Sequence, residues 1–210
     1  MYSTVTEKLN RACVGVVGCG GLGGYVIEYL LRLGIGHIKA ADEDTFDESN
    51  LNRQLYSSPE NLGKSKVQEA ETRASLLNPS CNFEPWDCFI DEENAAEFVS
   101  GCDVIIDALD NAESRKNLAS ACSDAGIPFI HGAISGWNLQ VAAIAPGTDG
   151  LEKIYSAGEG KRDSTLPFTP AICAGYEVAE ALKILLGEET EFGKLKCIDL
   201  LSSEEITIEI

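Results

Sequence analysis

Apolar and polar positions along the chain fall into short blocks that predict strands and helices in alternation. Residues 12–17 form an apolar run that ends in glycines, which is typical of a buried strand entering a tight turn. Residues 22–33 carry apolar side chains at helical spacing and are followed by glycines that end a helix. A second strand is expected at 37–41, ending at Asp42. This unit predicts a Rossmann-like, doubly wound α/β fold.

The rest of the chain continues the pattern. The expected elements are a polar segment at 44–63, helices at 64–77, 92–99 and 112–125, and strands at 81–85, 104–108, 129–133 and 139–144. Residues 147–170, with four glycines and two prolines, are interpreted as a crossover loop. A closing helix at 171–186 and a hairpin of 195–200 with 205–210 should follow. We therefore expect a mostly parallel sheet with antiparallel strands at its C-terminal end, in one domain spanning 1–210.

Composition narrows the classes of partner. The chain has 34 acidic and 16 basic residues and a net charge of -18, which disfavours binding to nucleic acid or an anionic membrane surface. Its longest apolar stretches are only strand-length, and its N-terminus has no leader pattern. The eight cysteines form no Cys-x-x-Cys pair. Reduced thiols in a cytoplasmic protein are the expected state.

The glycine turn after the first strand predicts a nucleotide site. Gly18, Gly20 and Gly23 satisfy the G-x-G-x-x-G pattern, in which small residues bring backbone N–H groups and a helix N-terminus close to phosphate. Asp42 ends the next strand, where it can accept hydrogen bonds from ribose hydroxyls. The motif alone does not separate ATP from NAD, so an NAD-dependent oxidoreductase is an alternative, and so is a glycine turn without a ligand.

Four sequence blocks in one order resemble the ThiF, MoeB and HesA family of adenylyltransferases, which are relatives of ubiquitin-activating enzymes. The blocks are Gly18-Cys19-Gly20-Gly21-Leu22-Gly23, the segment 41–54, Gly63-Lys64-Ser65-Lys66, and Asp107-Ala108-Leu109-Asp110-Asn111 followed by Arg115. The resemblance covers about 12–145, which would be the nucleotide-binding part, and continues more weakly through 171–186.

The resemblance implies that ATP lies across the glycine turn, with Asp42 at its ribose and with Asp110 holding Mg²⁺ beside Asn111. Arg53, Lys66 and Asp110 are the implied catalytic residues. The residues implied to contact the nucleotide are Gly18, Gly20, Gly21, Gly23, Asp42, Asp44, Asn50, Arg53, Gln54, Lys66, Asp110, Asn111 and Arg115. The role of Arg115 is the least defined of these.

The implied reaction is the adenylation of the C-terminal carboxylate of a small ubiquitin-like sulfur carrier with a Gly-Gly tail. The carrier would be ThiS-like or MoaD-like, for thiamine, molybdopterin or tungstopterin sulfur transfer. The enzyme is expected to be a homodimer.

The chemistry accounts for these residue types independently. A tail carboxylate is ionised at neutral pH, so its attack on the α-phosphate requires positioning and charge neutralisation rather than a general base. Arg53, Lys66 and a metal ion held by Asp110 would supply that charge. Taken singly, Asp110 could instead cap the helix from 112. A non-catalytic carrier-binding scaffold of the same fold is the remaining alternative, although it would not need these charged groups.

The chain departs from the family pattern in three respects. It lacks the two Cys-x-x-Cys pairs that hold zinc in longer members, so no zinc is expected. Arg11 stands too close to the first strand for us to assign it the arginine that reaches a partner's ATP site in those members. Cys173, just after the crossover loop, is the one candidate thiol, but a small packing residue is the favoured interpretation. We therefore expect adenylation without a thioester step.

Overall fold

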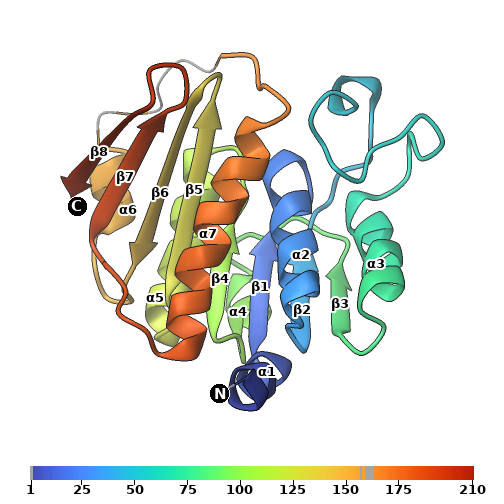
Figure 1. Cartoon of the computed structure of the whole chain (residues 1–210), viewed down its shortest axis with the longest axis horizontal. Helices are drawn as coiled ribbons and strands as arrows, with labels where there is room; N and C mark the ends of the chain where they lie inside the picture. The colour runs from blue at the N-terminus through green and yellow to red at the C-terminus, as the bar shows by residue number, and fades with distance from the viewer. Residues whose placement is uncertain (1, 157, 159–162) are drawn as a thin grey trace.

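The structure is a computed structural model that describes residues 2–156, 158 and 163–210. One eight-stranded sheet in the order β3-β2-β1-β4-β5-β6-β7-β8 forms its centre (Figure 1). The strands are β1 (Cys13–Val17), β2 (His37–Ala41), β3 (Asn82–Trp86), β4 (Val104–Asp107), β5 (Phe129–Ser135), β6 (Asn138–Ile144), β7 (Lys194–Asp199) and β8 (Glu204–Glu209). Neighbouring strands are parallel from β3 to β5 and antiparallel from β5 to β8. The predicted fold class is confirmed.

Helices cover both faces of this sheet. They are α1 (Tyr2–Arg11), α2 (Gly21–Leu33), α3 (Lys66–Leu77), α4 (Ala95–Val99), α5 (Ala112–Ala125), α6 (Gly150–Ile154) and α7 (Thr169–Leu186), with a 3₁₀ turn η1 (Glu48–Asn50). Figure 1 shows α2, α3 and α7 in front of the sheet and α4, α5 and α6 behind it. Strand alternation explains the two cores: Val14 and Val16 pack into the first, and Cys13 and Val17 into the second.

Three elements differ from the sequence-based expectations. The polar start of the chain forms α1, which packs against the turn before β2, where Gly36 donates its N–H to the Leu9 carbonyl at 3.0 Å. A Cβ at Gly36 would lie 1.9 Å from the Asn10 carbonyl oxygen, so this docking requires glycine. Among the side chains of α1 that the structure describes, Leu9 is the only buried apolar one. This explains why apolar periodicity did not reveal the helix.

The other two differences involve short helices. The helix expected at 92–99 begins only at Ala95, because Asp91 accepts hydrogen bonds from the N–H groups of Glu93 and Asn94 and so forms a turn. The expected crossover loop contains α6, a helix of five residues. Among the described residues, no helix is both long and apolar enough to cross a membrane.

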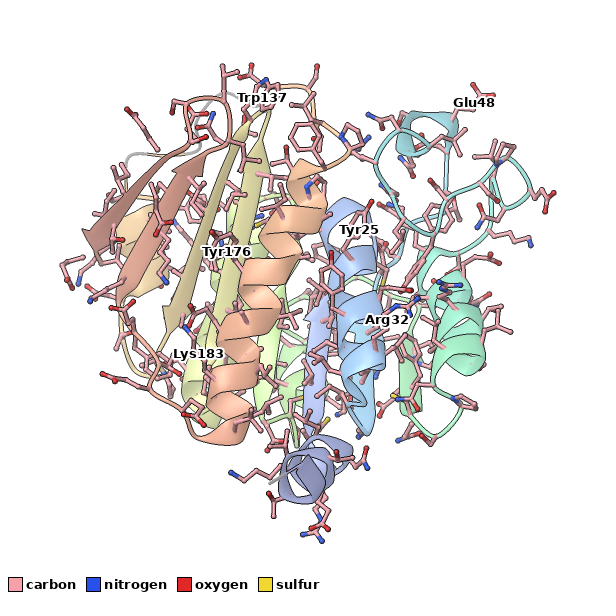
Figure 2. All side chains as sticks on the ribbon, in the orientation of Figure 1. Tyr25, Arg32, Glu48, Trp137, Tyr176 and Lys183 are labelled. Carbon is pink, nitrogen blue, oxygen red and sulfur yellow. The ribbon has the colours of Figure 1, made fainter. Side chains whose placement is uncertain are left out.

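The parallel strands all end at one edge of the sheet, and this edge positions the site. The β1–α2, β2–η1 and β4–α5 connections leave the sheet there, as Figure 1 shows at the top. Figure 2 places Glu48 and Trp137 at the same end of the molecule, on either side of it. In such folds, ligands bind beyond the carboxyl ends of the strands.

Candidate functional site

A cavity of about 1000 Å³ opens at this edge and runs from the glycine turn to the antiparallel strands. Eleven of the thirteen residues implied to bind the nucleotide line it: Gly18, Gly20, Gly21, Asp42, Asp44, Arg53, Gln54, Lys66, Asp110, Asn111 and Arg115. We call the part formed by the glycine turn and segment 42–66 the nucleotide end. Gly23 and Asn50 do not line the cavity.

The glycines of the turn divide into two kinds. Gly18 has a φ of +99°, and a Cβ there would lie 2.6 Å from the Ala108 carbonyl oxygen. A Cβ at Gly23 would lie 1.7 Å from the Gly18 carbonyl oxygen, so both positions require glycine for the turn itself. Gly20 and Gly21 instead face the cavity, and α2 begins at Gly21. The N-terminus of α2 therefore points its backbone N–H groups and its dipole at this space.

Asp42 is held rigidly beside the turn. Its Oδ2 accepts the Cys19 N–H at 2.6 Å, and its Oδ1 accepts the Asp44 N–H at 2.8 Å. Burial raises the pKa of Asp42, although the Cys19 hydrogen bond and the Lys66 ammonium oppose this shift. A carboxylate fixed in this way at the cavity wall presents its remaining lone pairs as acceptors for a diol such as ribose.

Two cations lie at the nucleotide end. Lys66 is only 7% exposed, and its Nζ pairs with Asp44 Oδ2 at 2.8 Å. Ser65 caps α3, so Lys66 is fixed as the first residue of that helix. Arg53 donates from Nη1 to the Ser49 carbonyl at 2.7 Å and to Asn52 Oδ1 at 2.9 Å. Both charged groups reach the cavity. Each is paired there with flexible or partly exposed groups, which an anion could replace.

Gln54 and Asn50, which are both buried, behave differently. The Oε1 atom of Gln54 is buried without a hydrogen-bond partner in the described structure, and its amide lies over Gly20 at the cavity. Asn50 holds its own turn, because its Nδ2 donates to Asp47 Oδ1 and its Oδ1 accepts the Asp47 N–H, each at 3.2 Å. In this structure Asn50 shapes the loop that presents Arg53 and Gln54.

Asp110 faces the cavity because its neighbour supplies the helix cap. Asn111 Oδ1 accepts the Ser114 N–H at 2.9 Å, so Asn111 is the N-cap of α5. Asp110 is exposed, and its Oδ1 accepts from Asn111 Nδ2 at 3.4 Å. Among the described residues, no three His, Cys, Asp or Glu side chains gather as a metal site. One exposed carboxylate at the cavity still fits Mg²⁺, which is commonly bound through one or two carboxylates together with substrate phosphates.

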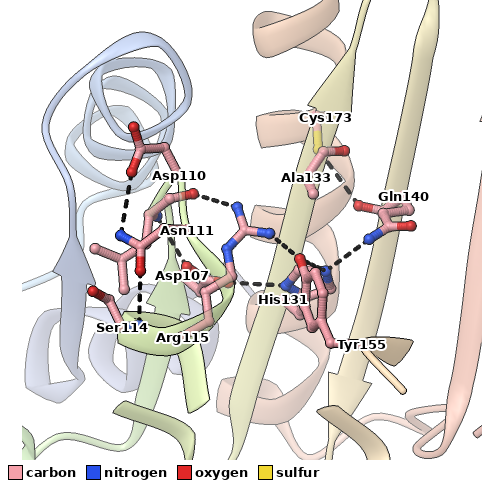
Figure 3. A network of polar contacts seen from close by, with 11 residues as sticks. Asp107, Asp110, Asn111, Ser114, Arg115, His131, Ala133, Gln140, Tyr155 and Cys173 are labelled. Carbon is pink, nitrogen blue, oxygen red and sulfur yellow. Dashed lines mark hydrogen bonds and ion pairs between the residues drawn. The ribbon is translucent and has the colours of Figure 1, made fainter. Parts of the chain in front are cut away.

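Behind Asp110 lies a network of polar contacts that sequence reasoning missed (Figure 3). It has four members, which we call the buried cluster: Asp107, Arg115, His131 and Tyr155. Asp107 and His131 are fully buried, with Asp107 Oδ2 2.9 Å from His131 Nδ1. Arg115 Nε lies 3.3 Å from the same Oδ2. Arg115 also donates to the Tyr155 hydroxyl and to the Leu109 carbonyl.

Burial and charge set the protonation states in this region. Burial lowers the pKa of His131, with Asp107 opposing the shift, so the imidazole is neutral at neutral pH. Burial also disfavours the charged form of Arg115, but Asp107 and Tyr155 outweigh it and raise its pKa. Glu177 of α7 adjoins the cluster, and burial, followed by repulsion from Asp107, raises its pKa well above the ordinary range. An Asp and a His inside two adjacent apolar strands are the sequence signal that could have revealed this cluster.

The far wall of the cavity is one face of the antiparallel strands. The strand register places Ala133, Gln140, Cys197 and Ile206 in one row across β5, β6, β7 and β8. Ser135, Asn138, Asp199 and Glu204 form a second row beside it. An extended peptide could lie along this wall with its end directed toward Asp110.

Cys173, the candidate thiol, lies away from the cavity surface. It is fully buried in α7, and its Sγ faces the Gln140 carbonyl at 3.8 Å. Burial, and then repulsion from Glu177, raises the pKa of the thiol well above the ordinary range. These surroundings suit a packing residue better than a nucleophile.

Comparisons with known proteins identify the family and the fold. The model of the ThiF family matches residues 2–210. The chain is 33% identical over 204 residues to a SAMP-activating enzyme E1 of Haloferax volcanii, covering 92% of this chain and 75% of the relative. It is 33% identical over 197 residues to a sulfur carrier protein adenylyltransferase of Thermus thermophilus, covering 86% and 72%. The structure of E. coli MccB with MccA-N7isoASN has the same fold, with a TM-score of 0.86 at 20% identity over 99% of this chain and 67% of that one.

Proposed function

This chain belongs to the ThiF family, and from that premise we propose that it uses ATP to adenylate the C-terminal glycine carboxylate of a small ubiquitin-like sulfur carrier protein. One observation carries the proposal. A single cavity joins the glycine turn, Lys66, Arg53 and Asp110 to a sheet wall able to seat an extended tail. The names of the two relatives, an E1 and a sulfur carrier adenylyltransferase, support the same reaction class.

The residues at the nucleotide end suit an attack on the α-phosphate. Gly20 and Gly21 allow the phosphates to approach the N-terminus of α2, and Asp42 orients the ribose. Lys66 and Arg53 neutralise the charge that develops on the phosphates and on the leaving pyrophosphate. The tail carboxylate attacks phosphorus directly, forming the carrier acyl-adenylate as the bond to pyrophosphate breaks. No proton has to be removed, because the carboxylate is already ionised.

Asp110, assisted by Asn111, is the residue proposed to hold Mg²⁺. When bound, the ion would neutralise charge on the phosphate oxygens. The exposure of Asp110 at the cavity supports this role. The side chain itself only needs to keep its carboxylate directed toward the phosphates.

The finer identity of the partner is also part of the proposal. We propose a ThiS-like or MoaD-like carrier with a Gly-Gly tail, serving thiamine, molybdopterin or tungstopterin sulfur transfer. A second protein would add the sulfur, and Cys173, the candidate thiol, is buried away from the cavity. We further propose that the protein acts as a cytoplasmic homodimer, which sedimentation of the purified chain would test.

Pyrophosphate exchange is the decisive measurement. Purified protein is given MgATP and labelled pyrophosphate, with recombinant ThiS and MoaD tested separately and with each carrier lacking its last glycine as control. Label should enter ATP only with an intact carrier, and Asp110→Ala should abolish the exchange. An absence of exchange with every carrier, despite tight ATP binding, would contradict adenylation.

The same preparation separates the alternatives. An NAD-dependent oxidoreductase would bind NAD in preference to ATP when both are titrated side by side. A non-catalytic scaffold would bind a carrier without exchange. The charged groups of the nucleotide end favour adenylation, because neither alternative requires Lys66, Arg53 and Asp110 around one phosphate site.

A further inference from the structure

Arg115 differs from Lys66 and Arg53 because its guanidinium is buried and contacts three separate parts of the protein. Its Nη1 donates to the Tyr155 hydroxyl, its Nη2 donates to the Leu109 carbonyl, and its Nε lies 3.3 Å from Asp107 Oδ2. Arg115 is only 6% exposed, although it lines the cavity. These contacts fix the orientation of the planar guanidinium, although they use only part of its five N–H donors and its Nε is buried without a hydrogen-bond partner in the described structure.

The contacts of Arg115 fix the residue immediately before Asp110. Leu109 donates its N–H to Asp107 Oδ1 at 2.9 Å, and its carbonyl accepts from Arg115. Both backbone groups of Leu109 are therefore clamped by one ion pair. Since Asp110 follows directly, this clamp determines where its carboxylate emerges into the cavity. Figure 3 shows Arg115 between the Asp110 turn and Tyr155.

On its other side, Arg115 docks the residue that follows α6. The Tyr155 ring lies edge-on to His131 with centroids 5.6 Å apart, and the Arg115 guanidinium carbon is 5.8 Å from the Tyr155 ring centroid. The Tyr155 hydroxyl also lies 3.5 Å from His131 Nε2. Tyr155 itself lines the cavity. Arg115 therefore joins the 107–111 turn to the segment that contains α6 through one side chain.

We propose that Arg115 is a positioning residue that couples the 107–111 turn to the segment 150–156, so that docking of Tyr155 sets the placement of Asp110 for the nucleotide. The predicted effect on nucleotide binding rests on the proposed function, since the 107–111 turn carries the residue proposed to face MgATP. The proposal assigns Tyr155, through its contacts with Arg115 and His131, a share in nucleotide affinity.

A direct phosphate contact by Arg115 is the competing interpretation, and the two differ in what Tyr155 does. If Arg115 bound phosphate directly, removing the Tyr155 hydroxyl would leave ATP affinity unchanged or free the guanidinium to bind more tightly. If Arg115 positions Asp110, removing that hydroxyl loosens the same turn that Arg115→Lys loosens. The two changes would then act through one path and would not add.

The test compares Arg115→Lys, Tyr155→Phe and the double variant with the unaltered chain, and uses Lys116→Arg as a control for exchanging one cation for another on α5. Hydrogen exchange of the ATP-free proteins is measured at 107–111 and 150–156. ATP binding in the presence of Mg²⁺ is measured by calorimetry without a carrier. Tyr155→Phe should accelerate exchange in both segments and weaken ATP binding by roughly five-fold, the usual effect of one lost hydrogen bond. The double variant should bind ATP no more weakly than Arg115→Lys.

Unchanged exchange at 107–111 in Tyr155→Phe would overturn the coupling, and so would additive losses of ATP affinity in the double variant. Tyr155→Phe keeps the test decisive even if Arg115→Lys fails to fold. The exchange measurement needs neither nucleotide nor carrier. Intact coupling without carrier-dependent pyrophosphate exchange would therefore overturn adenylation alone.

Discussion

The nucleotide end and the buried cluster use similar charged side chains in different ways. At the nucleotide end, Lys66 and Arg53 come from one stretch of chain and reach the cavity, and the amide oxygen of Gln54 is buried without a partner. The four members of the buried cluster come from β4, α5, β5 and the position after α6, and they bind one another. The buried cluster therefore organises the site, whereas Lys66 and Arg53 pair with exposed groups that a ligand can replace.

The sharpest test of this comparison replaces Lys66, whose ammonium is nearly buried yet aimed at the cavity. Lys66→Met should lower carrier-dependent pyrophosphate exchange by about a thousandfold, because a charge fixed beside the phosphates is lost. Its salt bridge is with an exposed carboxylate, so the melting temperature should change little. Steady-state exchange and calorimetric melting provide the two readouts.

Lys64→Met is the matched control, since Lys64 lies two residues earlier and pairs with Glu69 at the surface at 3.5 Å. It should retain nearly full exchange. Equal losses in both variants would mean that the nucleotide end acts through general surface charge, and the contrast with the buried cluster would then disappear.

The glycine turn tests the shape of the nucleotide end independently of its charge. Gly23→Ala should destabilise the protein by about 3 kcal/mol, the upper range for forcing extra atoms into a packed site, because its Cβ would meet the Gly18 carbonyl oxygen at 1.7 Å. Gly24→Ala should stabilise it by about 0.7 kcal/mol, the gain from alanine inside a helix. A Cβ there meets only ordinary contacts, the nearest being Leu55 Cβ at 3.7 Å.

Denaturant titration of the two single variants measures both effects. Opposite signs at adjacent positions would show that one glycine is required by geometry and the other is not. A Gly23→Ala variant as stable as the unaltered chain would show that the turn can relax. The glycine turn would then not hold the nucleotide end in a fixed geometry.

The two regions also differ in how far the sequence predicts them. The strands and the glycine turn were predictable because each depends on spacing within one short segment. The contacts of Arg115 were not, since they depend on which strands become neighbours, and β4 and β5 bring Asp107 beside His131 only in the folded sheet. Asn50 shows the same limit, because its contacts with Asp47, which hold η1, appear only in the folded loop.

Two glutamates one turn apart on α7 test the electrostatics next to the buried cluster. Glu177 is fully buried with neither oxygen hydrogen-bonded in the described structure, whereas Glu180 pairs with Lys183 at 2.9 Å and Lys196 at 3.6 Å. Glu177→Met should stabilise the protein at neutral pH by about 1 kcal/mol, or about 3 °C in melting temperature. Glu180→Met should destabilise it by a similar amount.

The pH dependence fixes the sign of the Glu177 effect. Because the folded-state pKa of Glu177 is raised above its ordinary 4.5, the folded state holds the proton more tightly, and stability falls as pH rises above that ordinary value. The advantage of Glu177→Met should therefore be small near pH 4 and should grow through neutral pH. An advantage that does not change with pH would contradict a protonated Glu177 in the folded protein.

Only a small effect on exchange is expected at Cys173, which stands on the same helix but contributes packing alone. Cys173→Ala should leave carrier-dependent exchange within about two-fold of the unaltered chain and cost about 1 kcal/mol of stability for the lost sulfur contacts. N-ethylmaleimide should not label Cys173 in the folded protein, because its thiol is fully buried and burial raises its pKa. Rapid labelling, or loss of exchange in Cys173→Ala with the melting temperature unchanged, would place a reactive thiol at the site. In that case the reaction would extend beyond the acyl-adenylate.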